Sequence, residues 1–182
     1  MLQYIIVHYK KGALSMTALE IQSLKQFMHA FLADDTFDLF LLEEAVITTY
    51  NTFHIDGRQN KSFYSSEEWN DPAIRPYEFT RWKDLRGICF DLIKGRRTPA
   101  GFKFVLQLIP DYIEGILKNE DTLLKPDDIK ALVLTLKYDG TRLTLVTGTS
   151  LKTFLPDQSL EPCWDGAIRR FLAKHGLHYE EL

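Results

Sequence analysis

Several residue types and patterns that would point directly to a function are scarce in this sequence. It has only two cysteines, Cys89 and Cys163, with no C-x-x-C pair and no histidine at zinc-finger spacing. A disulfide framework and a cysteine-based zinc site are therefore excluded, and we expect two reduced, mostly buried thiols. No apolar run approaches the roughly 18 residues that a membrane-spanning helix needs, which excludes an integral membrane protein. The apolar stretch Leu2–Val7 is too short for a secretory signal and its basic residues follow it, so we expect a cytoplasmic protein.

An excess of one charge sign is also missing. The 182 residues include 22 basic and 25 acidic side chains, so the overall balance does not indicate a polyanionic partner. With 45% hydrophobic and 26% charged residues, the composition is that of an ordinary globular protein and excludes a disordered chain. The sequence contains no cluster of metal ligands, no phosphate-binding glycine motif and no nucleophile elbow. We therefore predict neither a metal nor a cofactor.

The first 15 residues fit the rest of the chain poorly. They lack the periodicity that begins after Met16, and in a bacterial gene Lys11-Gly12-Ala13 can be encoded by AAA-GGA-GCN, which contains a ribosome-binding core shortly before the Met16 codon. We therefore interpret residues 1–15 as a translated leader and residues 16–182 as the domain. The alternative, an edge strand over Tyr4–Tyr9, is compatible with the β-propensity of that stretch and stays open.

The remaining residues predict a single α+β domain, with a mainly antiparallel sheet and helices packed on one face. Apolar residues recur at helical spacing after Ser23, between Trp82 and Gly95, and before Gly176, and alternate elsewhere as in strands. We find no linker and no internal repeat. The expected helices are 24–33, 82–94, 111–117 and 160–175; the expected strands are 19–21, 45–55, 102–108 and a hairpin around residue 139; residues 65–79 are expected to form a surface loop with one helical turn.

Two dipeptides, Asp56-Gly57 and Asp139-Gly140, predict hairpin turns. A two-residue turn at the second of them pairs residues of like character across the two strands, which makes the register self-consistent. The same register brings two basic side chains together, which costs stability unless they are solvated or bound to an anion. The predicted pairs are Leu136 with Leu143, Leu134 with Leu145, and Lys137 with Arg142.

A set of short motifs resembles an uncharacterised bacterial family, known only as a domain of unknown function and found mostly in low-GC Gram-positive bacteria. The resemblance covers about residue 18 to the C-terminus, and its specificity comes from the order of the motifs along the chain. It implies a stand-alone cytoplasmic domain and carries no established activity, so it assigns no catalytic residue. The motifs are Phe37-Asp38 with Leu41-Leu42, Phe53–Arg58, Ile93–Pro99, Thr147–Ser150 and Trp164-Asp165.

The distribution of charge is the most informative signal. Residues 16–79 hold four basic and eleven acidic side chains, whereas residues 80–110 hold seven basic and two acidic ones. Guanidinium groups bind oxyanions through two hydrogen bonds, and a glycine lets the backbone approach a phosphate. The alternative is a solvated basic loop that meets the acidic N-terminal half within the fold. The candidate anion-binding residues are Lys94, Arg96, Arg97, Thr98 and Lys103, to which the hairpin adds Lys137 and Arg142.

A second candidate is the polar side of the strand predicted over residues 45–55. Tyr50, His54 and Asp56 alternate and would share one face. Imidazole and carboxylate at this spacing could act as a base and its orienting group, or could hold a metal. A metal site needs a further ligand and a triad needs a nucleophile, and the sequence provides neither. The alternative is a solvent-facing strand side that ends in a turn.

We therefore expect a small cytoplasmic binding or accessory protein without catalysis, which contacts an anionic partner, with nucleic acid among the candidates, through residues 94–103. An enzyme that acts on a phosphorylated small molecule through the same basic loop, with His54 and Asp56, is the first alternative. An interaction module whose acidic N-terminal half docks a basic protein is the second. A pocket that joins His54 to the basic loop would favour the enzyme.

Overall fold

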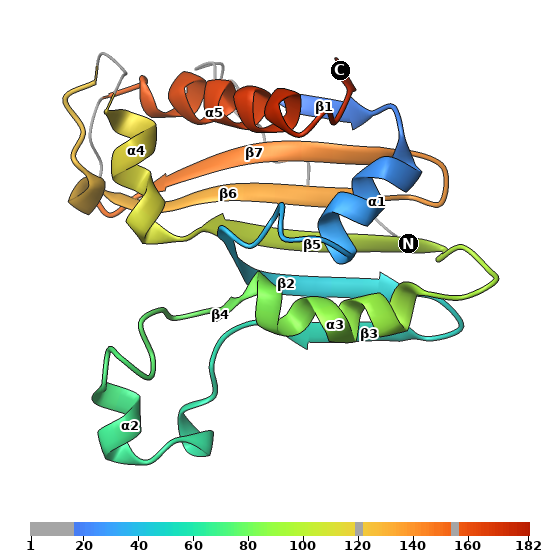
Figure 1. The fold of residues 1–182 in the computed structure, drawn as a ribbon. Helices are drawn as coiled ribbons and strands as arrows, with labels where there is room; N and C mark the ends of the chain where they lie inside the picture. The colour runs from blue at the N-terminus through green and yellow to red at the C-terminus, as the bar shows by residue number, and fades with distance from the viewer. Residues whose placement is uncertain (1–16, 119–121, 154–156) are drawn as a thin grey trace, which may run out of the picture.

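The computed structural model of the chain describes residues 17–118, 122–153 and 157–182, and in these residues eight strands form one antiparallel sheet (Figure 1). Seven strands follow one another in the order β3-β2-β5-β6-β7-β1-β8, and β4 pairs with β2. The strands are β1 (Ala18–Ile21), β2 (Phe40–Thr48), β3 (Thr52–Asp56), β4 (Thr80–Arg81), β5 (Gly101–Leu108), β6 (Ile129–Tyr138), β7 (Leu143–Leu151) and β8 (Tyr179–Glu181).

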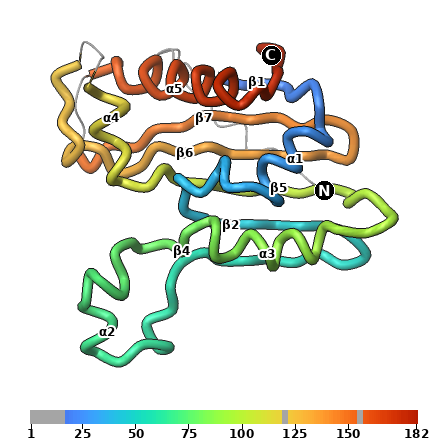
Figure 2. The backbone as a smooth tube through the Cα atoms, in the orientation of Figure 1, coloured from blue at the N-terminus to red at the C-terminus, as the bar shows by residue number. Residues whose placement is uncertain are grey.

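Four of the helices lie over the same face of the sheet (Figure 1). The fifth, α2, belongs to a long excursion between β3 and β4 that projects from one end of the sheet, as the backbone path in Figure 2 shows. The predicted α+β fold, with helices packed on one face of an antiparallel sheet, is confirmed. The helices are α1 (Leu24–Leu32), α2 (Ser66–Asn70), α3 (Trp82–Ile93), α4 (Ile113–Leu117) and α5 (Leu160–Lys174), with 3-10 turns at Lys61–Phe63, Pro110–Tyr112 and Pro126–Asp128.

The predicted leader, residues 1–15, and the alternative strand over Tyr4–Tyr9 lie outside the described residues. The same is true of Met16, the first residue of the domain if a leader precedes it. Both interpretations therefore stay predictions.

An aromatic cluster between the helices and the sheet forms the centre of the core. Phe31 of α1 stacks on Trp82 of α3 with ring centroids 4.3 Å apart, and it also meets Phe104 of β5 edge-on at 5.0 Å. All three side chains are fully buried. Trp82 donates its indole N–H to the carbonyl of Phe31 at 3.0 Å, so burial leaves no polar atom of this ring unsatisfied. The cluster thus fixes α3 against both α1 and the sheet.

The β6–β7 hairpin has a longer turn than the sequence predicted. Tyr138 pairs with Leu143, so the turn holds four residues, 139–142, instead of two. The Asp139 carboxylate accepts hydrogen bonds from the backbone N–H groups of Thr141 and Arg142 at 2.9 and 2.8 Å, which closes the wider turn, and Gly140 adopts a positive φ of 97°.

The predicted hairpin register is wrong by two positions. A shift of two residues keeps every side chain on its predicted face, and Leu134 and Leu145 are both buried as expected. The cross-strand partners nevertheless change. Leu136 pairs with Leu145, Leu134 with Thr147, and Lys137 with Thr144.

The prediction of a hairpin turn at Asp56-Gly57 is also wrong. The turn between β2 and β3 lies at residues 49–51, where the N–H of Thr49 donates to the carbonyl of Asn51 at 2.9 Å. Gly57 instead lies against the irregular part of β2. A Cβ atom built on it would stand 1.7 Å from the carbonyl oxygen of Leu42. The glycine is therefore required by a close backbone approach and not by a hairpin tip.

A buried carboxylate connects α5 to the strands beneath it. Asp165 is only 3% exposed, and its two oxygens accept hydrogen bonds from the hydroxyls of Thr17, at 2.5 Å, and Thr147. Arg169 donates to the same Thr17 hydroxyl at 3.2 Å and forms an ion pair with Glu181 of β8 at 2.8 Å. The network links α5 to β7, β8 and the residue that precedes β1.

We predict that Asp165→Ala destabilises the protein by about 3 kcal/mol, because two buried hydroxyls lose the charged acceptor that satisfies them. Asp127→Ala, at an exposed position, should change the free energy of unfolding by less than about 0.5 kcal/mol. Urea unfolding of the three proteins measures both effects. Equal stabilities for the two variants would contradict the role assigned to Asp165.

The turn at 139–142 makes a pH-dependent contribution to stability. Hydrogen bonds from Arg142 and Thr141 lower the pKa of Asp139 to about 2 in the folded protein. Because the folded-state pKa is depressed, this contribution is present above the unfolded pKa of about 4 and is lost as the pH falls toward 2. Asp139→Asn should therefore be less stable than the natural protein at neutral pH, and the difference should shrink over this acidic range. Urea unfolding across the range measures it, and a difference that is independent of pH would refute the assignment.

Candidate anion-binding site

The basic loop, residues 94–100, lies at one end of the sheet. It connects α3 to β5, and in Figures 1 and 2 it lies at the same end as the β2–β3 and β6–β7 turns. Its last residue, Ala100, is bonded to the end of β2 and lies close to the backbone of the β6–β7 turn. The N–H of Ala100 donates to the carbonyl of Thr48 at 2.9 Å, and a Cβ built on Gly140 would stand 3.0 Å from the carbonyl oxygen of Ala100. Residues 94–98 are all exposed.

A cleft of about 370 Å³ separates the basic loop from the β2–β3 turn. Tyr50, at that turn, is 84% exposed and lines the cleft opposite the loop. Thr49 also lines it, and its hydroxyl is buried without a hydrogen-bond partner among the described residues. Because this hydroxyl is buried, a ligand in the cleft could bond to it only after the Thr49 side chain rotates, so the hydroxyls and cations available to a ligand are those of the basic loop. The cleft is lined by Thr49, Tyr50, Leu92, Ile93, Lys94, Gly95, Arg96, Arg97, Thr98 and Ala100.

The other side of the basic loop borders a second, more apolar hollow. It has a volume of about 470 Å³ and extends toward α1. Leu24, Met28 and Phe102 contribute apolar surface, and Lys25 adds one positive charge. The basic loop therefore presents its cations between the cleft beside Tyr50 and an apolar hollow.

Three of the seven basic residues of the 80–110 segment form ion pairs with carboxylates of the fold. Arg86 forms an ion pair with Asp38 at 2.6 Å, Lys94 with Asp91 at 2.7 Å, and Lys103 with Glu44 at 2.9 Å. In the described part of the chain, Arg96 and Arg97 form no ion pair at all. Arg81, which lies over the Tyr77 ring, and Lys83 also form no ion pair among the described residues, but only Arg96 and Arg97 place two unpaired, exposed cations side by side.

The structure does not bring the remaining candidate cations to the basic loop. Lys103 and Lys137 pair with each other across β5 and β6 and point away from the helices, into solvent. The predicted facing of Lys137 and Arg142 is wrong because the turn is four residues long, and Arg142 instead lies 3.7 Å from Glu20. Like-charge repulsion across the sheet therefore acts between Lys103 and Lys137, where Glu44 relieves it.

His54 and Asp56 also lie away from the basic loop. They share the sheet face without helices and line a polar hollow of about 440 Å³ together with Glu43, Glu44 and Arg58. Tyr50, which was predicted to share their strand face, is removed from them by the turn at 49–51. Among the described residues no group of three His, Cys, Asp or Glu side chains could hold a metal.

The two cysteines lie in separate helices and are both buried, as predicted. Burial raises the pKa of the Cys89 thiol to about 12, so it is protonated at neutral pH and does not act as a nucleophile.

The basic loop could be identified from the sequence, whereas Thr49 and the role of Tyr50 could not. Their position depends on the turn between β2 and β3, which the Asp-Gly dipeptide predicted at residues 56–57.

In the three described stretches, no helix has the length and apolar composition to cross a bilayer. No curated protein and no solved structure matches the chain. The model of a family of unknown function, DUF5721, matches residues 30–180, which cover nearly all of the sheet and every helix except the start of α1. The chain therefore belongs to this family of unknown function, DUF5721.

Proposed function

We propose that this protein is a binding or accessory protein that holds an anionic partner at the basic loop. The observation that carries the proposal is that Arg96 and Arg97 are adjacent, exposed and without an ion pair in the described structure, whereas Lys94 next to them is paired with Asp91. Adjacent exposed arginines repel each other, and a bound phosphate or carboxylate relieves that repulsion.

The surroundings of the two arginines suit a phosphate-bearing ligand. The exposed Thr98 offers a neutral hydroxyl beside the guanidinium groups. Tyr50 provides an exposed ring on the opposite wall, where a base or another flat group can stack. A ligand with phosphates and rings, such as a single-stranded nucleic acid, would use all three features.

Binding without catalysis is favoured by the residues that line the cleft. Its described lining contains no carboxylate, imidazole or thiol that could act as a general base or as a nucleophile. His54 and Asp56 lie on the opposite face of the sheet, so they cannot act on a ligand held at the basic loop.

The acidic N-terminal half offers less free charge than its sequence indicates, because Asp38, Glu44 and Glu78 each form an ion pair within the fold. We place this function in the cytoplasm, in agreement with two buried thiols.

The charge-neutralisation model predicts the behaviour of the double variant Arg96→Ala/Arg97→Ala. Fluorescence anisotropy with a labelled single-stranded oligonucleotide should show binding at low salt that weakens steeply as salt rises. The double variant should bind more weakly, and its log–log salt slope should be flatter by about 1.4, which corresponds to two phosphate contacts. Its thermal stability should hardly change, because exposed loop residues make few core contacts.

The matched control is Lys118→Ala/Lys125→Ala, which removes two exposed positive charges outside the basic loop. It should leave both affinity and salt slope nearly unchanged. A duplex of the same sequence tests whether stacking on Tyr50 contributes, since paired bases cannot stack there. Absence of binding to both oligonucleotides at low salt would remove nucleic acid from the candidates, and unfolding of the double variant would assign the arginines to the fold.

A further inference from the structure

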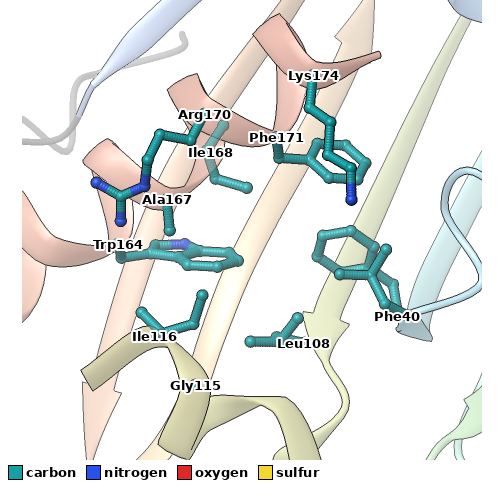
Figure 3. A pocket seen from close by; sticks show the side chains of 11 residues that line it. Phe40, Leu108, Gly115, Ile116, Trp164, Ala167, Ile168, Arg170, Phe171 and Lys174 are labelled. Carbon is teal, nitrogen blue, oxygen red and sulfur yellow. The ribbon is translucent and has the colours of Figure 1, made fainter. Parts of the chain in front are cut away.

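A hollow of about 540 Å³ opens between α4, α5 and the sheet, at the end opposite the basic loop (Figure 3). The paired strands β2 and β5 separate the hollow from the basic loop. Phe40 and Leu108, paired at one end of these strands, line the hollow. Thr48 and Gly101, paired at the other end, adjoin the basic loop. The two sites are therefore independent, and a ligand of the hollow would be additional to the anionic partner proposed for the basic loop.

The floor of the hollow is apolar and has no free polar atom to offer. Trp164 and Phe40 are almost fully buried, with ring centroids 6.5 Å apart, and Phe171 lies 6.1 Å from Phe40. The indole N–H of Trp164 already donates to the carbonyl of Val133 at 2.8 Å, so this ring presents only carbon surface to the hollow. Such a floor suits a hydrocarbon chain or ring.

The rim of the hollow is positively charged. Arg170 and Lys174 are one helical turn apart on α5, and both line the hollow. Figure 3 shows the Lys174 side chain beside the Phe171 ring with its ammonium directed toward the hollow, and Arg170 on the side of Trp164. Lys174 forms no ion pair with any described residue, and the described lining contains no carboxylate. An apolar cavity with a cationic rim is complementary to an apolar body that carries one negative charge.

We propose that this hollow binds an apolar monocarboxylate, with the carboxylate at Lys174 and the hydrocarbon part over Trp164, Phe40 and Ile116. Its volume lies within the range of about 300–1,000 Å³ that small-molecule sites occupy. Lys174 is also placed to stabilise the C-terminal end of α5, and a role of that kind would not depend on the charge of a ligand. The experiment must therefore separate the two roles.

Octanoate is the probe, and 1-octanol, which has the same chain length without the charge, is the matched ligand. Their dissociation constants and contact sites are measured by two-dimensional amide NMR titration. The natural protein should bind octanoate about tenfold more tightly than octanol, as expected for one charge-assisted contact. Shifts should centre on Ile116, Ala167 and Phe171. Lys174→Gln should weaken octanoate about tenfold and leave octanol unchanged.

A second variant tests the cavity itself. Gly115 lines the hollow on α4, and a Cβ built on it meets no atom within 4 Å, so the backbone there accepts a side chain and Gly115→Leu adds bulk at the hollow. It should weaken both ligands, while Lys118→Gln, on the residue that caps α4, should weaken neither. Equal affinity for octanoate and octanol, unchanged octanoate binding in Lys174→Gln, or shifts away from α4 and α5 would overturn the proposal. So would the absence of binding by the natural protein.

Discussion

Two buried tryptophans attach the helices to a sheet on which, in the described residues, the helices cover one face. Each ring lies in the core, and each indole N–H donates to a backbone carbonyl of another element: Trp82 to Phe31 in α1, and Trp164 to Val133 in β6. A buried N–H without an acceptor would cost on the order of 1–3 kcal/mol. The position and rotation of α3 and α5 are therefore set by these two bonds together with the apolar packing around the rings.

Both candidate sites depend on those two helices. The basic loop begins where α3 ends, so the packing that holds α3 on the sheet, including the Phe31–Trp82 contact at its start, also positions the start of the loop. The apolar hollow uses Trp164 as its floor and the last turns of α5 as its cationic rim. The one-sided arrangement also explains why His54, on the open face, is separated from the basic loop, which extends from the helix-covered side (Figure 1).

Features that depend on local periodicity could be predicted from the sequence. Helical spacing placed α3 and α5, and alternation placed β5 with Lys103 facing solvent, because each pattern reports directly on which side chains are buried. The turns were harder to predict. Asp-Gly favours a two-residue turn, but the Asp139 carboxylate accepts hydrogen bonds that close a wider turn. Gly57 is required by the close approach of the Leu42 backbone in β2, which no local pattern indicates.

The candidate site could be predicted only in part, for the same reason. Exposed arginines beside a glycine are visible in the sequence, whereas the ion pairs that neutralise Arg86 and Lys103 join residues 48 and 59 positions apart. The approach of Tyr50 and Thr49 to the basic loop depends on the true position of the β2–β3 turn. The hollow under α5 needs three elements to form, and no short motif in the sequence indicates it.

If the protein binds an anion as we propose, uncompensated charge, and not total charge, determines where that anion lies. Mapping of amide chemical shifts during titration with a short single-stranded oligonucleotide tests it most directly, because paired and unpaired lysines and arginines are compared within one molecule. We expect shifts confined to residues 94–100 and to the turn at 49–51. Shifts centred on the cross-strand pair of Lys103 and Lys137, where Glu44 neutralises Lys103, would contradict it.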